Sequence, residues 1–127
     1  MKQIKDFLIE HSLLCVILGL VILLPFYIVP LKNAIATEKA YDIFNRHNCL
    51  SCHHFTETKI GPAFNDVVDY YIDSDDWDYP ITVQVLGNKL RDGGVGRWGN
   101  IPMPPMSLHR NESEYIIKWI FDKKWEK

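Results

Sequence analysis

Residues Cys49-Leu50-Ser51-Cys52-His53 decide the fold of this chain, because they form the pattern C-x-x-C-H. Two thiols three positions apart can reach the two vinyl groups of one porphyrin and form thioether bonds with them. The imidazole of the next residue can then turn under the porphyrin and bind its iron. The motif therefore predicts one covalently attached c-type haem, with iron, held by Cys49 and Cys52 and ligated by His53.

Three other uses of a C-x-x-C pair compete with this interpretation. A thioredoxin-like dithiol needs a strand-to-helix setting, and no βαβ pattern surrounds the motif. A structural zinc site needs further ligands, but no second cysteine pair follows in the sequence. A plain disulfide is compatible with an oxidising compartment. The histidine in the fifth position favours haem attachment over all three.

Short helices are predicted around the motif. They span residues 37–47, 62–71, 80–90 and 111 onward, with Thr37, Pro62, Asp78 and Asn111 at their respective starts. Gly93-Gly94 are expected to stop the third helix, and Asn111 with Glu114 is a variant of the capping box. Residues 93–105 are rich in Gly and Pro and are predicted to be irregular, and no stretch alternates like a strand. We therefore predict an all-α fold of short helices wrapped around one central haem, preceded by a hydrophobic N-terminal helix.

The second axial ligand of the iron is sought among the downstream nitrogen and sulfur donors. His54 adjoins His53 and cannot reach the opposite face of the porphyrin. Met103 is the centre of an IPMPP segment, whose prolines stiffen the backbone and hold an outward-turned thioether at little further entropy cost. We favour Met103, with Met106 as the second candidate and His109 as the third.

An uncharged apolar run of seventeen residues extends from Leu13 to Val29. Lysines precede it, and the A-x-A sequence of residues 34–36 follows it, as in a signal peptide. The run is long for a signal peptide and short for a membrane span. Residues 1–36 are therefore either a cleaved signal peptide or a retained membrane anchor. In both cases residues 37–127 form a haem domain on the periplasmic side of the membrane.

Composition excludes several classes of protein. The 127 residues are 47% hydrophobic and 24% charged, which rules out intrinsic disorder and allows one small domain beside the apolar run. The net charge of −2 argues against a nucleic-acid binder. Three cysteines are too few for a disulfide scaffold.

These features together resemble the small monohaem class I cytochromes c of the bacterial periplasm. The resemblance covers most of residues 37–127. Phe44 and Trp119 stand where that family keeps the aromatic residues of its first and last helices, which cross. Residues 98–105, WGNIPMPP, are similar to the family's specific Trp-Gly-x-x-Pro-Met-Pro-Pro segment.

The resemblance implies a role for each matching residue. Pro62, in a Gly-Pro pair, would accept a hydrogen bond from the ring of His53. Met103 would be the distal ligand, Trp98 would contact a haem propionate, and Ile101 would belong to the haem environment. Side chains expected to line the pocket are Phe64, Val67, Leu86, Leu90, Ile101 and Trp119.

One departure from the family concerns Met106, which stands where close relatives often carry an asparagine that hydrogen-bonds the ligating sulfur. Without that donor, the Met103 side chain is expected to change its orientation on iron more freely. The loop of residues 73–78 is acidic and longer than in a typical member, which is expected of a solvated turn or, alternatively, of a docking surface.

The predicted function is one-electron transfer in a periplasmic respiratory chain, by a carrier protein and not an enzyme. Its partners would be redox proteins, and the membrane if the N-terminal segment is retained; no nucleic acid is expected. Lys89, Arg91 and Arg97 would give either a modest positive rim for docking or only solubility. Two alternatives remain: a membrane-tethered haem subunit of a respiratory complex, and a peroxidase-like or gas-binding haem protein whose Met103 leaves the iron readily.

Overall fold

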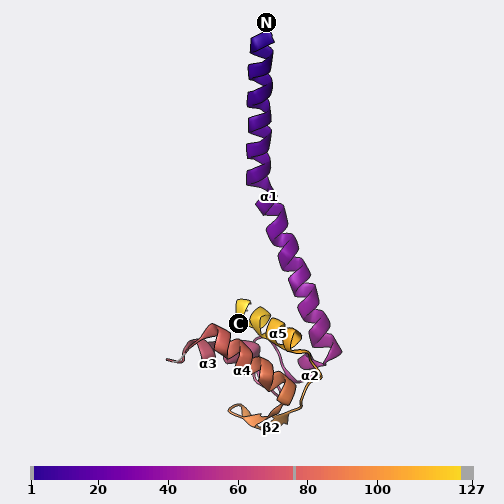
Figure 1. Cartoon of the computed structure of the whole chain (residues 1–127). Helices are drawn as coiled ribbons and strands as arrows, with labels where there is room; N and C mark the ends of the chain where they lie inside the picture. The colour runs from indigo at the N-terminus through magenta and orange to yellow at the C-terminus, as the bar shows by residue number, and fades with distance from the viewer. Residues whose placement is uncertain (1, 76, 124–127) are drawn as a thin grey trace. The chain divides into compact units, whose positions relative to one another are not determined.

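The computed structural model describes residues 2–75 and 77–123, with side chains from residue 11 onward (Figure 1). The chain divides into two compact units, Met1–Thr37 and Glu38–Lys127. The first helix, α1 (Lys2–Arg46), contributes residues to both units. The second unit carries the C-x-x-C-H motif and all the other elements.

The predicted start of a helix at Thr37 is wrong, because α1 already begins at Lys2. A threonine caps a helix only where the first N–H groups have no carbonyl acceptors. Here the preceding turns are helical and supply those carbonyls, so that no cap is needed. Pro25 and Pro30 also lie inside α1.

The second unit is mostly helical, as predicted. After α1 its elements are α2 (Cys49–Cys52), α3 (Phe64–Ile72), α4 (Tyr79–Asp92), β1 (Gly94–Gly96), β2 (Gly99–Met103) and α5 (Arg110–Asp122). Helices α4 and α5 run side by side, and the strands follow α4 directly (Figure 1). Helix α3 begins two residues after the predicted start at Pro62, with Ala63 as its N-cap.

The prediction that residues 93–105 are irregular is wrong for most of that segment. Strands β1 and β2 form an antiparallel hairpin that pairs Gly94 with Met103 and Gly96 with Gly99. No side-chain alternation announces these strands, since all but the last residue are exposed. Backbone hydrogen bonds form the ladder, and a two-stranded sheet tolerates Pro102 because both of its strands are edges.

The predicted ends of α4 are confirmed. The Asp78 carboxylate accepts a hydrogen bond from the backbone N–H of Ile81 at 2.9 Å, and Pro80 lies in the first turn. Gly93 follows the helix with a φ of 66°, a value that residues with a side chain rarely adopt.

Helix α5 begins two residues earlier than its predicted capping box. Its N-cap is His109, whose N–H donates to the Glu112 carboxylate at 3.2 Å. Asn111 and Glu114 have the same spacing but already lie within the helix. Leu108, the residue before this N-cap, is buried.

Aromatic rings fill the centre of the second unit. Phe44 of α1 meets Trp119 of α5 edge to face, with ring centroids 5.6 Å apart. Phe64 of α3 stacks on Phe44 at 5.4 Å. These pairs join the first helix to the last and to α3, in agreement with the crossing implied by the resemblance. The buried apolar residues of the core are Ala40, Ile43, Phe44, Ala63, Phe64, Val68, Val83, Leu108, Ile116, Ile117, Trp119 and Ile120.

Candidate haem site

The two cysteines of the motif lie on one turn of helix. Asn48 has a left-handed conformation, with φ 52°, and turns the chain from α1 into α2. The Ser51 hydroxyl donates to the Asn48 carbonyl at 2.6 Å and holds this turn. Because Cys49 and Cys52 are three residues apart in α2, their side chains share one face. Both are half-buried free thiols, as attachment to one porphyrin requires.

The Cys49 thiol lies in a desolvated position. Burial raises the pKa of this thiol, and the neighbouring Cys52 adds a smaller effect in the same direction, while a backbone hydrogen bond opposes them. Desolvation disfavours the thiolate, which is the form that oxidises most easily. In this position the neutral thiol of Cys49 is favoured over the thiolate.

The ring of His53 is oriented by three neighbours. Its Nδ1 lies 2.8 Å from the carbonyl oxygen of Pro62, and because that oxygen can only accept, Nδ1 carries the proton. The Nε2 atom then has the free lone pair that a metal requires. Phe64 stacks on the ring at 5.3 Å. Gly61 lies so close that any Cβ there would overlap the imidazole.

Backbone hydrogen bonds close the loop that brings Pro62 back to His53. The backbone N–H of Gly61 donates to the Cys52 carbonyl at 2.8 Å, and the backbone N–H of Phe64 donates to the His54 carbonyl at 3.0 Å. The His54 Nδ1 accepts from the backbone N–H of Thr56 at 3.3 Å. His54 therefore takes part in the loop's own structure, and its position supports the expectation that it is not a ligand.

The segment around Met103 is attached to the end of α4. A Cβ at Gly93 would lie 2.5 Å from the Met103 carbonyl oxygen and 2.6 Å from the Pro105 nitrogen. The Met106 N–H donates to the Leu90 carbonyl at 3.0 Å. Met103 is half-buried, unlike the preceding residues of β2. The close approach at Gly93, which sequence reasoning treated only as a helix stop, thus determines where the predicted ligand lies.

The other candidates for the second ligand differ in their surroundings. Met106 is half-buried as well and lies three residues after Met103 in the sequence. His109 is exposed and forms the N-cap of α5. Met103 and Met106 therefore remain the two sulfur donors of this segment, and Met103 keeps the advantage of its flanking prolines.

Apolar side chains of the hairpin are exposed, although Trp98 also contacts Tyr70 of α3. The exposed fractions are 59% for Val95, 43% for Trp98 and 66% for Ile101. Of the other predicted pocket residues, Phe64 and Trp119 are buried in the core, and Val67, Leu86 and Leu90 are half-buried. Apolar surface on this hairpin is available to cover a flat apolar group. Together with two thiols, an oriented imidazole and a thioether, it fits a haem.

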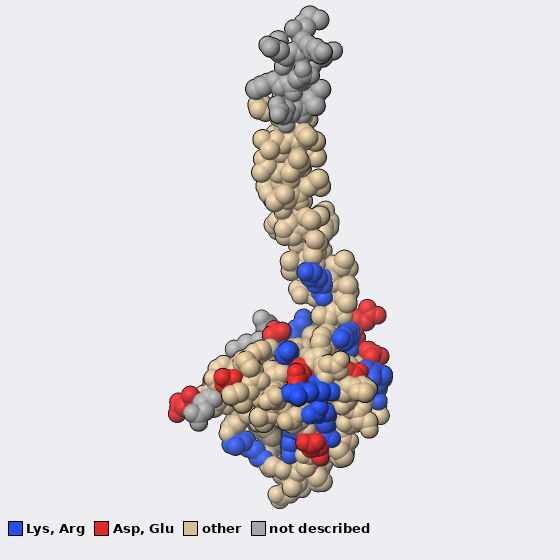
Figure 2. Space-filling view, in the orientation of Figure 1, with Lys and Arg blue, Asp and Glu red and all other residues tan. Residues whose placement is uncertain are grey.

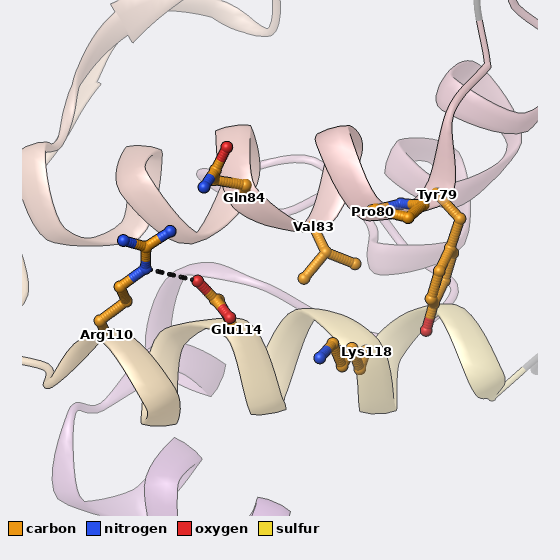
Figure 3. A pocket seen from close by; sticks show the side chains of 7 residues that line it. All are labelled: Tyr79, Pro80, Val83, Gln84, Arg110, Glu114 and Lys118. Carbon is orange, nitrogen blue, oxygen red and sulfur yellow. Dashed lines mark hydrogen bonds and ion pairs between the residues drawn. The ribbon is translucent and has the colours of Figure 1, made fainter.

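A separate groove of about 290 Å³ lies between α4 and α5 (Figure 3). It is lined by Tyr79, Pro80, Val83, Gln84, Arg110, Glu114 and Lys118. Arg110 and Glu114, one turn apart on α5, form an ion pair at 2.7 Å, and this hydrogen bond lowers the pKa of the Glu114 carboxyl. None of the lining residues belongs to the attachment loop or to the Met103 segment. The groove therefore takes no part in the haem site.

Known proteins resemble this chain over its second unit. No family model matches the sequence. Cytochrome c-552 of Hydrogenobacter thermophilus is 36% identical over 76 residues, which are 60% of this chain and 72% of that protein. Cytochrome c-551 of Pseudomonas denitrificans is 34% identical over 83 residues, 65% of this chain and 95% of that protein. The crystal structure of wild-type Nitrosomonas europaea cytochrome c552 superposes with a TM-score of 0.55 at 32% identity, covering 66% of this chain and 99% of that one.

Proposed function

The chain belongs to the small class I monohaem cytochromes c of the c-551/c-552 type, and we propose from this that it carries single electrons between redox proteins. Its fold is the all-α cytochrome c fold with one short hairpin, and its cofactor is one covalent c-type haem with iron. When bound, the haem iron supplies the one-electron couple between its ferric and ferrous states.

The observation that carries the proposal is the oriented imidazole beside two free thiols. Cys49 and Cys52 would hold the porphyrin edge through thioether bonds. His53 would ligate the iron through Nε2, since the Pro62 carbonyl keeps the proton on Nδ1 at 2.8 Å. That hydrogen bond also makes the imidazole a stronger donor. Met103 would bind the opposite side.

Ligation from both sides favours a carrier over an enzyme. With His53 and Met103 as ligands, the iron would have no open position for a substrate, and little structural change would accompany each electron. The thioether is a weak donor that favours ferrous iron and raises the reduction potential. The apolar surroundings act in the same direction, because they disfavour the additional positive charge of the ferric state.

The purified holoprotein tests this proposal directly. We expect low-spin spectra in both oxidation states, reversible one-electron reduction at a positive potential, and slow binding of carbon monoxide to the ferrous form. A high-spin fraction in the resting state with fast carbon monoxide binding would instead support the gas-binding or peroxidase-like alternative. Recovery of folded, colourless protein from a host competent in cytochrome maturation would overturn both.

We also propose that residues 1–36 remain as a membrane anchor, which holds the haem domain on the periplasmic side of the membrane. Helix α1 continues through Pro30 and Leu31, so its uncharged part runs from residue 12 to residue 31 and not only from 13 to 29. These twenty residues span about 30 Å, the thickness of the hydrocarbon core. The large apolar side chains of this stretch are exposed, and the stretch has no Lys, Arg, Asp or Glu, so the face that Figure 2 shows is uncharged there.

Fractionation of cells producing the full chain tests the anchor. We expect the haem protein in the membrane fraction after a high-salt wash, with an intact mass that includes residues 1–36. Release by salt, or a mature N-terminus near residue 37, would show a cleaved signal peptide. The electron-carrier proposal stands in either case, because it depends only on residues 37–127.

A further inference from the structure

The turn of the β1–β2 hairpin rests on one tyrosine of α3. Trp98 meets Tyr70 edge to face, with ring centroids 5.7 Å apart and an interplanar angle of 80°. The guanidinium carbon of Arg97 lies 4.4 Å from the centre of the same ring. Two consecutive residues of the turn therefore contact the Tyr70 side chain of α3, of which 37% remains exposed.

This contact lies at the turn of the hairpin, whereas α4 holds the open end and β1. At the open end, Gly93 lies against the Met103 backbone, and Met106 is bonded to Leu90. A hairpin of two short strands is at best marginally stable by itself, and the exposed strands bury little apolar surface. The position of β2 along its length therefore depends on what holds the turn. Lys89 of α4 donates a hydrogen bond to the Val95 carbonyl of β1 at 3.2 Å.

We propose that Tyr70 is a positioning residue for Met103, and that Tyr70, Arg97 and Trp98 form a clasp which holds the hairpin turn on α3. The inference rests on the proposed role of Met103 as the distal ligand. Met103 is the last residue of β2, and the clasp adjoins the first. Loosening the turn lets the strand shift, and the thioether then spends more time away from the iron.

The chemistry of the clasp requires the aromatic ring of Tyr70 and not its hydroxyl. A cation is attracted to the negative face of a ring, and an edge-to-face pair places the positive ring hydrogens of one ring against the face of the other. Phenylalanine preserves both interactions. Leucine keeps an apolar side chain but is smaller and has no ring quadrupole, so it abolishes both interactions, and the loss of volume is controlled by the same change at Tyr115. The pair Tyr70→Phe and Tyr70→Leu therefore separates the clasp from ordinary packing.

Hydrogen exchange of the holoprotein, followed by mass spectrometry, tests the clasp at the hairpin itself. We expect Tyr70→Leu to speed exchange across residues 94–103 about five- to seventyfold, the range expected for losing one cation–π and one aromatic contact. Tyr70→Phe should exchange like the wild type. Arg97→Gln should give an intermediate increase, because it leaves the Trp98 contact intact.

A matched control is available in the same unit. Lys39 lies 4.2 Å from the centre of the Tyr115 ring, and this pair joins α1 to α5 without touching the hairpin. Tyr115→Leu removes a comparable cation–π contact. It should leave exchange over residues 94–103 unchanged once rates are compared at equal global stability, measured by urea unfolding.

The absorption band of the methionine–iron bond provides the second readout. In Tyr70→Leu we expect this band to disappear at a lower urea concentration than the global unfolding signal, whereas in Tyr70→Phe the two remain together. Wild-type exchange rates in Tyr70→Leu, or equal acceleration in Tyr70→Phe, would overturn the clasp. A wild-type protein without the band would overturn Met103 ligation instead, while the exchange experiment would still report on the clasp.

Discussion

The haem site requires glycine at two positions, Gly61 and Gly93, because a Cβ there would overlap neighbouring atoms. At Gly61 the missing side chain lets the His53 ring lie against the backbone. At Gly93 it lets the backbone around Met103 approach the end of α4. The predicted proximal and distal ligands therefore each lie against a glycine, eight residues away in the sequence for His53 and ten for Met103.

Replacement of Gly93 by alanine should weaken Met103 ligation. Its φ of 66° disfavours a side chain, and the new Cβ would overlap the Met103 and Pro105 backbone. We expect a loss of the methionine–iron absorption band at neutral pH and faster binding of carbon monoxide. Gly96→Ala is the matched control, because a Cβ there meets only the Lys89 Nζ atom at 3.9 Å. Equal behaviour of the two variants would contradict the assigned role of Gly93.

Met103→Ala addresses the distal ligand itself. Loss of the thioether should lower the reduction potential and open the iron to small ligands, because the weak donor that favours ferrous iron is gone. Potentiometry and carbon monoxide binding measure the two effects. Met106→Ala serves as the comparison: it should retain the wild-type potential if Met103 is the ligand. If the reduction potential falls in Met106→Ala and not in Met103→Ala, the distal ligand is Met106 and not Met103.

At the level of elements, the ends of α4 follow from short-range interactions. The carboxylate of Asp78 satisfies one N–H of the first turn, and Gly93 ends the helix. Both interactions connect residues that are close in the sequence, so the sequence pattern could indicate them. The β1–β2 hairpin has no such local signal, and its contacts with other elements are those of Gly93, Leu90 and Lys89 in α4 or at its end and of Tyr70 in α3.

The N-cap of α4 makes a measurable contribution to stability. Asp78→Ala should lower the free energy of unfolding of the holoprotein by about 1 kcal/mol, the usual effect of losing such a cap. Asp78→Asn should restore most of it, because the amide oxygen can still accept the bond from Ile81. Asp92→Ala, at the opposite end of α4, should cause no loss, since a carboxylate there opposes the helix dipole. Denaturant unfolding of the three variants measures these differences.

For the second unit as a whole, an ion pair connects the first helix to the last. Arg46 of α1 donates to the Glu112 carboxylate at 3.0 Å, near the N-terminus of α5. This hydrogen bond is the main reason that the pKa of Glu112 is lowered, and the backbone N–H of His109 adds to it. The Glu112 carboxylate therefore favours the folded state while it is ionised.

This ion pair predicts a component of acid sensitivity. Because the pKa of Glu112 is lower in the folded state, its contribution is fully present above the ordinary value of 4.5 and is lost as pH falls through the folded value. Glu112→Gln should therefore flatten the decline of the urea midpoint below about pH 5. Adding Arg46→Gln to that variant should change the pH dependence little further. An acid decline as steep as in the wild type would contradict this role.

The sequence by itself determined the cofactor and the ends of α4. The C-x-x-C-H motif places two thiols and an imidazole within five residues, and helix caps act over three or four, so these features depend on local spacing alone. The family likeness of residues 98–105 likewise pointed to Met103 before any contact was known. Only the tertiary structure decided where α1 begins, which capping pattern α5 uses, and that residues 94–103 form a hairpin. It also brought Gly93 against Met103 and Tyr70 against Arg97 and Trp98. These outcomes depend on contacts beyond the three or four residues over which a helix cap acts, up to the contact of Tyr70 with Arg97 and Trp98, and local patterns carry no information about which segments will meet.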